Sequence, residues 1–170
     1  MLLDISSAAG KIVEDISDEW FKPLDRNYLS PSDFGFHNAI RTENELFFLD
    51  FEYAGLDSLW KLFCDFFSQP ELPVPIYYAE LFIRSELFAA LKNQPSDVAK
   101  AFKLTQLKWC LIMLNEFLPE IQARRCHSMH LSWTKSVSEA LLRQQLMKSK
   151  LYFSQIEQRT EQLHKVLTQI

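Results

Sequence analysis

The scarcity of glycine restricts this sequence more than any other feature. Among 170 residues there are only three glycines, Gly10, Gly35 and Gly55, where an average usage of about 7% would give about twelve. The nucleotide-binding patterns G-x-G-x-x-G and G-x-x-x-x-G-K-[ST] need glycines at fixed spacings, because the backbone must approach a phosphate closely. The three glycines match neither spacing. The chain therefore does not supply a glycine-rich phosphate-binding loop from these residues.

Size and charge narrow the class of protein further. The length fits one ordinary domain, and a composition of 48% apolar and 24% charged residues is typical of a packed globular protein. A net charge of −4 argues against a broad nucleic-acid-binding face. The longest apolar run, the six residues 109–114, is far shorter than the ~20 that span a bilayer. We therefore expect neither nucleic acid nor membrane as a partner.

The N-terminal residues and the cysteines indicate the cellular compartment. The first twenty residues are acidic, unlike the basic start of a signal peptide. Of the three cysteines, Cys64 and Cys110 lie in apolar stretches and are predicted to be buried, and no C-x-x-C pair occurs. These features predict a cytoplasmic protein.

The apolar pattern predicts a mainly α chain (α+β class) that forms a single domain over residues 1–170. Helical spacing, with proline and turn residues at the boundaries, predicts helices over 1–21, 59–68, 73–91, 98–118 and 134–169. The helix 98–118 is apolar on nearly all sides and is predicted to be central, capped by Ser96 or Asp97. Residues 28–38 are predicted to form a loop, and 39–41 with 46–51 the only strand pair.

Three polar residues lie close to this predicted hairpin. Asp33 and Asn38 are spaced as D-x-x-x-x-N in the loop, and Asp50 follows at the end of the second strand. Phosphoryl transfer from ATP needs one carboxylate to orient the acceptor hydroxyl and take its proton. It also needs a carboxylate and an amide oxygen to hold Mg²⁺, because hard cations take oxygen ligands. The pattern favours a phosphotransferase site, although each residue also fits a structural role as turn former, loop amide or strand-end cap.

Three stretches carry a resemblance to a known family: LSPSDFGFHNA (29–39), FLDFEYAGLD (48–57) and KLFCDF (61–66). They resemble the aminoglycoside phosphotransferase and choline kinase group of small-molecule kinases. The resemblance implies the helical C-terminal lobe of a protein-kinase-like fold. Its catalytic loop and metal hairpin would occupy 28–57, and a helical subdomain 58–170.

The same resemblance implies roles for individual residues. Asp33 would be the catalytic base, Asn38 and Asp50 the Mg²⁺ ligands, and ATP the phosphate donor. Glu52 lies where the choline kinase branch also has an acidic residue, which implies support of a second metal. Asp65 matches a family aspartate that braces the catalytic loop through its backbone, so we expect a structural role.

The chain departs from the family pattern at several points. The family usually has His-Gly before the base, whereas this chain has Pro31 and Ser32, so Ser32 is expected to support the tight loop in place of glycine. His37 is interpreted as a loop histidine bonded to backbone rather than as a substrate ligand. Residues 1–28 cannot form the nucleotide-binding N-terminal lobe. The chain is therefore expected to be inactive alone, to need that missing lobe as a partner, and to act on an unidentified small-molecule hydroxyl.

Two hypotheses compete with this one. The chain could instead be a non-catalytic kinase-like remnant, a helical interaction module that self-associates through 134–170. There, alternate steps of four and three from Leu142 to Ile170 approximate a heptad seam. It could also be a metal-binding regulator that uses Cys126, His127 and His130, although the paired Cys/His spacing of a zinc site is missing.

Two further groups of residues have a structural and a functional interpretation. The arginines 124 and 125 could contact an acidic substrate or the missing lobe, but a solvated surface patch is the simpler interpretation. An aromatic wall around a cationic acceptor is the other candidate site, and aromatic residues at helical spacing are more often core. Its members would be Trp60, Trp109, Trp133, Tyr77 and Tyr78.

Overall fold

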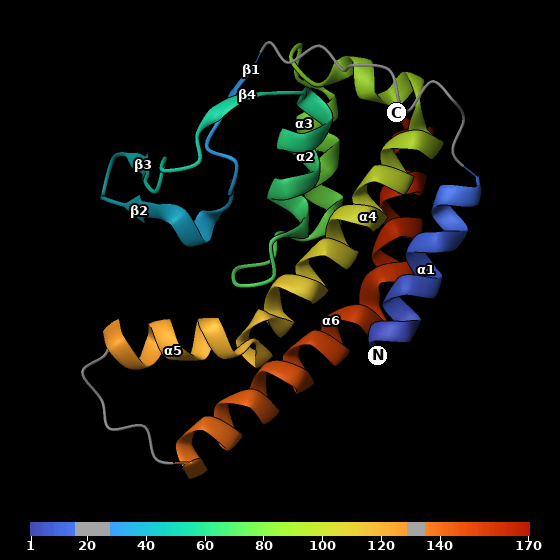
Figure 1. The fold of residues 1–170 in the computed structure, drawn as a ribbon. Coiled ribbons are helices and arrows are strands. Elements are labelled where there is room, and N and C mark those ends of the chain that lie inside the picture. The colour runs from blue at the N-terminus through green and yellow to red at the C-terminus, as the bar shows by residue number, and fades with distance from the viewer. Residues whose placement is uncertain (16–27, 129–134) are drawn as a thin grey trace.

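Helices make up most of this protein, and two small sheets lie to one side of them (Figure 1). The computed structural model describes residues 1–15, 28–128 and 135–170, and their side chains except those of 125–128 and 135–138. The mainly helical class predicted from the sequence is confirmed. The helices are α1 (Leu2–Glu14), α2 (Leu59–Ser68), α3 (Ala79–Ile83), α4 (Pro95–Leu114), α5 (Pro119–Ser128) and α6 (Lys135–Gln169).

The helix α4 is the centre of the helical part, as its apolar sequence predicted. It packs along α6, which runs antiparallel to it, and is flanked by α2 on one side and α1 on the other (Figure 1). Its first residues do not match the predicted cap. The N-cap is Gln94 and the helix already begins at Pro95, so Ser96 and Asp97 lie inside its first turn. Proline fits this first position because its missing N–H would have no partner there.

Two groups of buried side chains hold these helices together. The larger one, which we call the phenylalanine core, lies between α2, α3, α4 and the end of α6 and includes Phe63, Phe67, Phe102, Leu163 and Leu167. The second group joins α1 to the middle of α4 and α6. Cys64 and Cys110 are buried in the two groups, as predicted, and burial raises the pKa of the Cys110 thiol to about 11.

A buried polar network fixes the register of α4 against α6. The side chain of Gln106 is fully buried. Its amide oxygen accepts from Arg159 Nε at 3.1 Å, and its amide nitrogen donates to Thr160 Oγ1 at 3.3 Å. Arg159 also donates to the Phe67 carbonyl at the end of α2. Because each of these polar groups has its partner, burial does not leave them unsatisfied.

The helix predicted over 73–91 is broken into short pieces. Two 3₁₀ turns, η3 (Ile76–Tyr78) and η4 (Ala89–Asn93), lie on either side of α3. The break follows Arg84, where Ser85 turns back and its backbone and hydroxyl both donate to the Phe82 carbonyl. A serine that bonds to the preceding turn competes with the next helical hydrogen bond, and this ends α3.

The predicted hairpin is present, but it is not the only strand pair. Strands β2 (Ala39–Arg41) and β3 (Leu46–Phe48) pair antiparallel, with Ala39 opposite Phe48. In addition, β1 (Tyr28–Ser30) pairs antiparallel with β4 (Gly55–Asp57). The prediction of a single strand pair was therefore wrong, and β3 ends before Asp50 rather than at it. The second pair brings the two ends of the segment 28–57 together and closes it into one unit.

The seam of α6 is used inside the chain. Ser149, Ile156, Leu163 and Leu167, which belong to the predicted heptad seam, are all buried, and Ser149 Oγ donates to the Cys110 carbonyl at 3.1 Å. The end of α6 therefore folds back over the other helices, whereas its beginning extends past them together with α5 (Figure 1). After the 3₁₀ turn η5 (Asn115–Phe117), α5 begins at Pro119, the predicted boundary.

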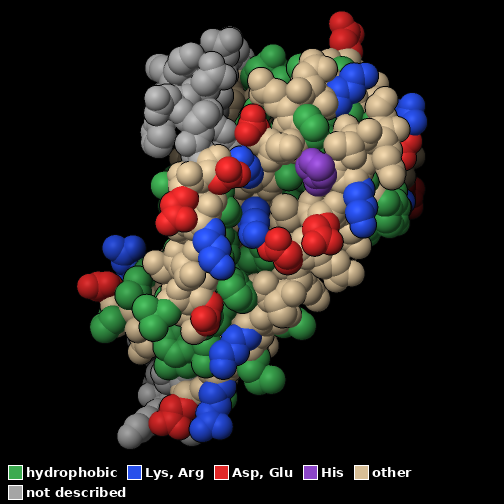
Figure 2. Space-filling model, turned by 90° about the vertical axis from the view of Figure 1, so that its right-hand side faces the viewer, with side chains coloured by type: hydrophobic (Ala, Val, Ile, Leu, Met, Phe, Trp, Pro, Cys, Tyr) green, Lys and Arg blue, Asp and Glu red, His purple; other side chains and the backbone are tan. Residues whose placement is uncertain are grey.

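The face seen in Figure 2 carries interspersed acidic and basic side chains, and hydrophobic side chains gather toward its lower end. Met147 and Leu151, one turn apart on α6, are 71% and 62% exposed. None of the helices in the described ranges combines the length and apolarity that crossing a bilayer requires.

Candidate functional site

The candidate site is the loop between β1 and β2, which contains Asp33 and ends in a 3₁₀ turn, η2 (Phe36–Asn38). Asp33 Oδ2 lies 3.2 Å from Nε2 of His37, and Asn38 Nδ2 donates to the Asp33 carbonyl at 3.1 Å. The aspartate and asparagine of the D-x-x-x-x-N pattern and the adjacent histidine thus form one hydrogen-bonded group. His37 bonds to the Asp33 carboxylate, so its interpretation as a histidine bonded to backbone was wrong.

Asp33 has an unused acceptor. Its side chain is 39% exposed, yet Oδ1 is buried and has no hydrogen-bond partner within the described part of the chain. A buried polar atom without a partner is rare in folded proteins. The part of the carboxylate that a ligand hydroxyl can reach is its exposed part, not Oδ1.

The hairpin register brings the backbone of Asp50 close to that of Asn38. Leu49 N donates to the Asn38 carbonyl at 2.7 Å, which continues the β2–β3 pairing one step toward the loop. Asp50 comes next and adopts a left-handed backbone, with φ of 59°. The amide nitrogen of Asn38 is committed to the loop, so its oxygen is the end that can serve as a ligand. The donor set of Asn38 and Asp50 consists of oxygens, which fits Mg²⁺.

Ser32, directly before Asp33, is the other non-glycine residue with a left-handed backbone in the described ranges, with φ of 69°. A left-handed conformation costs a non-glycine residue of order 1–3 kcal/mol and persists only where the surroundings enforce it. The position is thus one that glycine would fill without strain. Both strained residues belong to the predicted site, and such strain is concentrated at functional sites in proteins generally.

The Ser32 conformation is enforced by a lysine that the sequence analysis did not single out. Lys61 Nζ lies 3.0 Å from Ser32 Oγ and 3.4 Å from the Ser32 carbonyl. The same ammonium group donates to Asp57 Oδ2 at 3.0 Å and to Asp65 Oδ2 at 2.9 Å. The signal was present in the sequence, because Asp57, Lys61 and Asp65 are spaced one helical turn apart.

Asp65 reaches the loop through this lysine. It is only 2% exposed, and its other oxygen accepts from Lys108 of α4 at 3.0 Å. A buried carboxylate needs such partners, since an unpaired buried charge is very costly. Partial burial lowers the pKa of Lys61, but Asp65 and Asp57 together raise it more, so the net pKa lies above the usual value. We call Asp57, Lys61, Asp65 and Lys108 the lysine–carboxylate cluster.

Replacing Lys61 with methionine tests this cluster. Lys61→Met should lower the free energy of unfolding by about 1–3 kcal/mol, because Asp65 stays buried with one partner fewer. The folded-state pKa of Lys61 is raised, so its contribution is complete below about pH 10 and is lost as pH rises through the folded pKa. In urea unfolding, the difference between wild type and Lys61→Met should therefore shrink above about pH 10.5. Lys150→Met, at an exposed position of α6, is the control; a difference that stays constant with pH contradicts the assignment.

Phenylalanine rings dock the loop onto α2. Phe34 packs against Phe66 and Phe48, with ring centroids 4.9 and 5.0 Å apart. Phe36 meets Phe66 edge-on at 5.2 Å. Aromatic pairs prefer such tilted and edge-on arrangements, so these contacts stabilise the loop beyond the apolar area that they bury. The two rings on either side of Gly35 thus hold Asp33 and Asn38 over the end of α2.

Gly35 is required by close approach rather than by backbone conformation. A Cβ at this position would lie 2.8 Å from Nδ1 of His37 and 3.1 Å from Cγ of Gln69. The space is therefore filled by the imidazole that contacts Asp33. By contrast, a Cβ at Gly55 would meet nothing within 4 Å.

Alanine substitution separates these two glycines. Gly35→Ala should destabilise the protein by about 1–3 kcal/mol, because the extra methyl group pushes His37 away from Asp33. Gly55→Ala, in the same segment 28–57, should change stability by no more than about 0.5 kcal/mol. Chemical denaturation measures both, and NMR shifts of the His37 ring should move in Gly35→Ala alone. Equal effects at the two glycines would refute the close packing.

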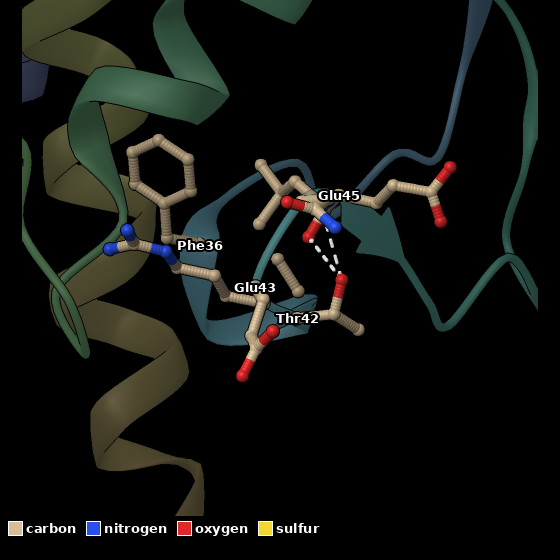
Figure 3. Close-up of a pocket in the computed structure, with 8 residues that line it drawn as sticks. Phe36, Thr42, Glu43 and Glu45 are labelled. Atoms are coloured by element: carbon tan, nitrogen blue, oxygen red, sulfur yellow. Dashed lines mark hydrogen bonds between the residues drawn. The ribbon is translucent and has the colours of Figure 1, made fainter.

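The turn of the hairpin forms a polar hollow on the far side of Phe36 (Figure 3). Thr42 Oγ1 bonds to the backbone nitrogen and the carbonyl of Glu45 and so closes the turn. Arg41, Glu43 and Glu45 line the hollow and are all exposed. Phe36 therefore lies between the charged side chains of the hairpin turn and the aromatic contacts that dock the loop onto α2.

Glu52 and the other carboxylates do not form a metal cluster by themselves. Glu52 is exposed and hydrogen-bonds the neighbouring Tyr53, which raises the pKa of that phenol. In the described ranges, no group of three His, Cys, Asp or Glu side chains is close enough to hold a metal ion. A metal at this site would therefore depend on the Asn38 amide and on oxygens from a ligand.

The structure describes some of the remaining predicted residues, and the others lie outside the described residues. Trp60 packs on the phenylalanine core and Trp109 on the second group, so they do not share one wall. The rings of Tyr77 and Tyr78 pack against each other at a tilt of 40°, with centroids 4.3 Å apart. Arg124 is exposed. The side chains of Arg125, Cys126, His127, His130 and Trp133 lie outside the described residues.

Comparison of the chain with protein-family models, with curated proteins and with solved structures found no match.

Proposed function

We propose that this chain is the helical lobe of an ATP- and Mg²⁺-dependent phosphotransferase with a kinase-like fold, which acts on a small-molecule hydroxyl. One observation carries the proposal: the loop group in which His37 and Asn38 hold Asp33 with its carboxylate partly exposed, close to the left-handed backbone of Asp50. Catalytic carboxylates need such fixed positions, because a small displacement from the reacting group costs much of the rate.

In this proposal Asp33 orients the acceptor hydroxyl and accepts its proton. His37 holds the Asp33 carboxylate through Nε2, and the lysine–carboxylate cluster holds the preceding residue, Ser32. Asn38 and Asp50 would hold Mg²⁺, with Glu52 in support; bound there, the cation would neutralise charge on the phosphates. The nucleotide itself would be positioned by a separate N-terminal lobe that acts as the partner of this chain.

Metal binding can be measured on this chain directly. Asp50→Asn should weaken Mn²⁺ binding, followed by electron paramagnetic resonance, by about tenfold or more, since affinity for hard cations depends on ligand charge. Glu43→Gln removes one carboxylate from the same hairpin at an exposed position and should leave the affinity unchanged. Equal loss of affinity in the two variants would show that Mn²⁺ is attracted only by the general surface charge and that Asp50 is not a specific ligand.

Phosphate transfer tests the base in the protein that includes the nucleotide-binding lobe. Asp33→Ala should lower transfer from γ-labelled ATP to a panel of small alcohols by about 10²–10⁴-fold, as expected for loss of a general base. Circular dichroism checks that the variant remains folded. Turnover at the wild-type rate would remove Asp33 from the mechanism.

A second candidate is the helical interaction module. Exposed Met147 and Leu151 on the outer face of α6 favour it, because large apolar side chains in a surface patch often mark an interface. The predicted seam is occupied within the chain, so self-association through 134–170 would use this outer face instead. Light scattering decides: a dimer that Met147→Lys dissociates supports the module, and a monomer at every concentration rejects it.

A further inference from the structure

An apolar groove lies beside the candidate loop, between η2, the end of α2 and α3. It has a volume of about 610 Å³, and all nine residues that line it are apolar or aromatic. Those that matter here are Phe36, Phe66, Leu72, Tyr78, Leu81 and Phe82.

The size and chemistry of the groove restrict what fits it. Small-molecule sites in proteins typically measure about 300–1,000 Å³, so this volume suits a small molecule. No ionisable Asp, Glu, Lys, Arg or His side chain lines the groove. An anionic ligand would lose its water there without gaining a partner, which is costly. The occupant that matches the apolar lining best is a neutral molecule with an aromatic or branched aliphatic body.

The floor and the rim of the groove differ in a way that supports binding. Phe66 on the floor is 4% exposed and is held by Phe82 at 4.9 Å, so this surface is preformed. Leu72 and Leu81 on the rim are 56% and 65% exposed. These apolar rim side chains are exposed to water in the free protein. A ligand that covers them removes apolar surface from water, which favours binding.

The groove and the candidate loop share Phe36. This residue follows Asp33 by three positions and precedes Asn38 by two, and its ring packs edge-on against Phe66. We propose that the groove binds the apolar body of a small neutral alcohol, with its hydroxyl directed toward Asp33. The binding stands on the groove itself, whereas the role of this alcohol as phosphate acceptor rests on the proposed function.

Binding is tested on the 170-residue chain without nucleotide. Titration calorimetry with 4-phenyl-1-butanol should show saturable binding, whereas glucose and the anion acetate should show none. Leu81→Glu should weaken binding by about tenfold or more, because an ionised carboxylate would be desolvated at the rim. Leu2→Glu, at a comparably exposed leucine on α1, should leave it unchanged. Leu72→Glu provides a second rim variant should Leu81→Glu fail to fold by circular dichroism.

Two results would overturn the proposed binding site: no saturable binding of phenylbutanol, or equal losses in the rim variants and in Leu2→Glu. The outcome is separable from that of the proposed function. If phenylbutanol binds at the groove while Asp33→Ala leaves transfer unchanged, the binding site stands and the phosphotransferase falls. If Asp33→Ala abolishes transfer to alcohols but no apolar alcohol binds at the groove, the phosphotransferase stands and the binding site falls.

Discussion

The buried carboxylate of Asp65 is the constraint on which the arrangement of this protein depends. Because an isolated charge cannot remain in the interior, α2 and α4 must each bring a lysine to it. Lys61 then has donors to spare, and these reach Asp57 and Ser32. One ionic requirement in the helical core therefore determines the position of a loop in the segment 28–57. A neutral residue at 65 would remove the shared partner of both lysines and leave Lys61 held by Asp57 and Ser32 alone.

Two kinds of interaction position the loop, and they act at different places. The lysine–carboxylate cluster fixes the backbone just before Asp33, whereas phenylalanine contacts fix the residues after it. At the first anchor the chain retains the left-handed Ser32, and Asp33 beside it keeps a buried oxygen without a partner in the described part of the chain. These contacts thus maintain a strained backbone conformation in the loop. Proteins keep such strain where a site is shaped before its ligand binds.

Periodicity in the sequence was enough to predict α2, α4, α6 and the β2–β3 hairpin, because each buries a regular apolar pattern. It failed over 73–91, where the hydroxyl of Ser85 competes with the helix, a local hydrogen bond that apolar spacing does not reveal. The β1–β4 pair was missed because β1 and β4 lie far apart in the sequence, whereas a short turn joins β2 to β3. At the candidate site, the roles of Asp33, Asn38 and Asp50 were proposed from their spacing and from the family resemblance. The spacing of Asp57, Lys61 and Asp65 indicated their ion pairs, but the contact of Lys61 with Ser32 depends on tertiary packing and that of His37 with Asp33 on the loop conformation.

The return of α6 over α2 has a consequence for biosynthesis. Leu163 and Leu167 complete the same core as Phe63 and Phe67, although about 100 residues of sequence separate them. As the nascent polypeptide leaves the ribosome, its phenylalanine-rich stretch must remain uncovered until translation reaches the distant helix that shields it. Such delayed contacts slow folding and prolong exposure of sticky surface. Newly made molecules of this protein are therefore expected to depend on chaperones more than a bundle with only local contacts would.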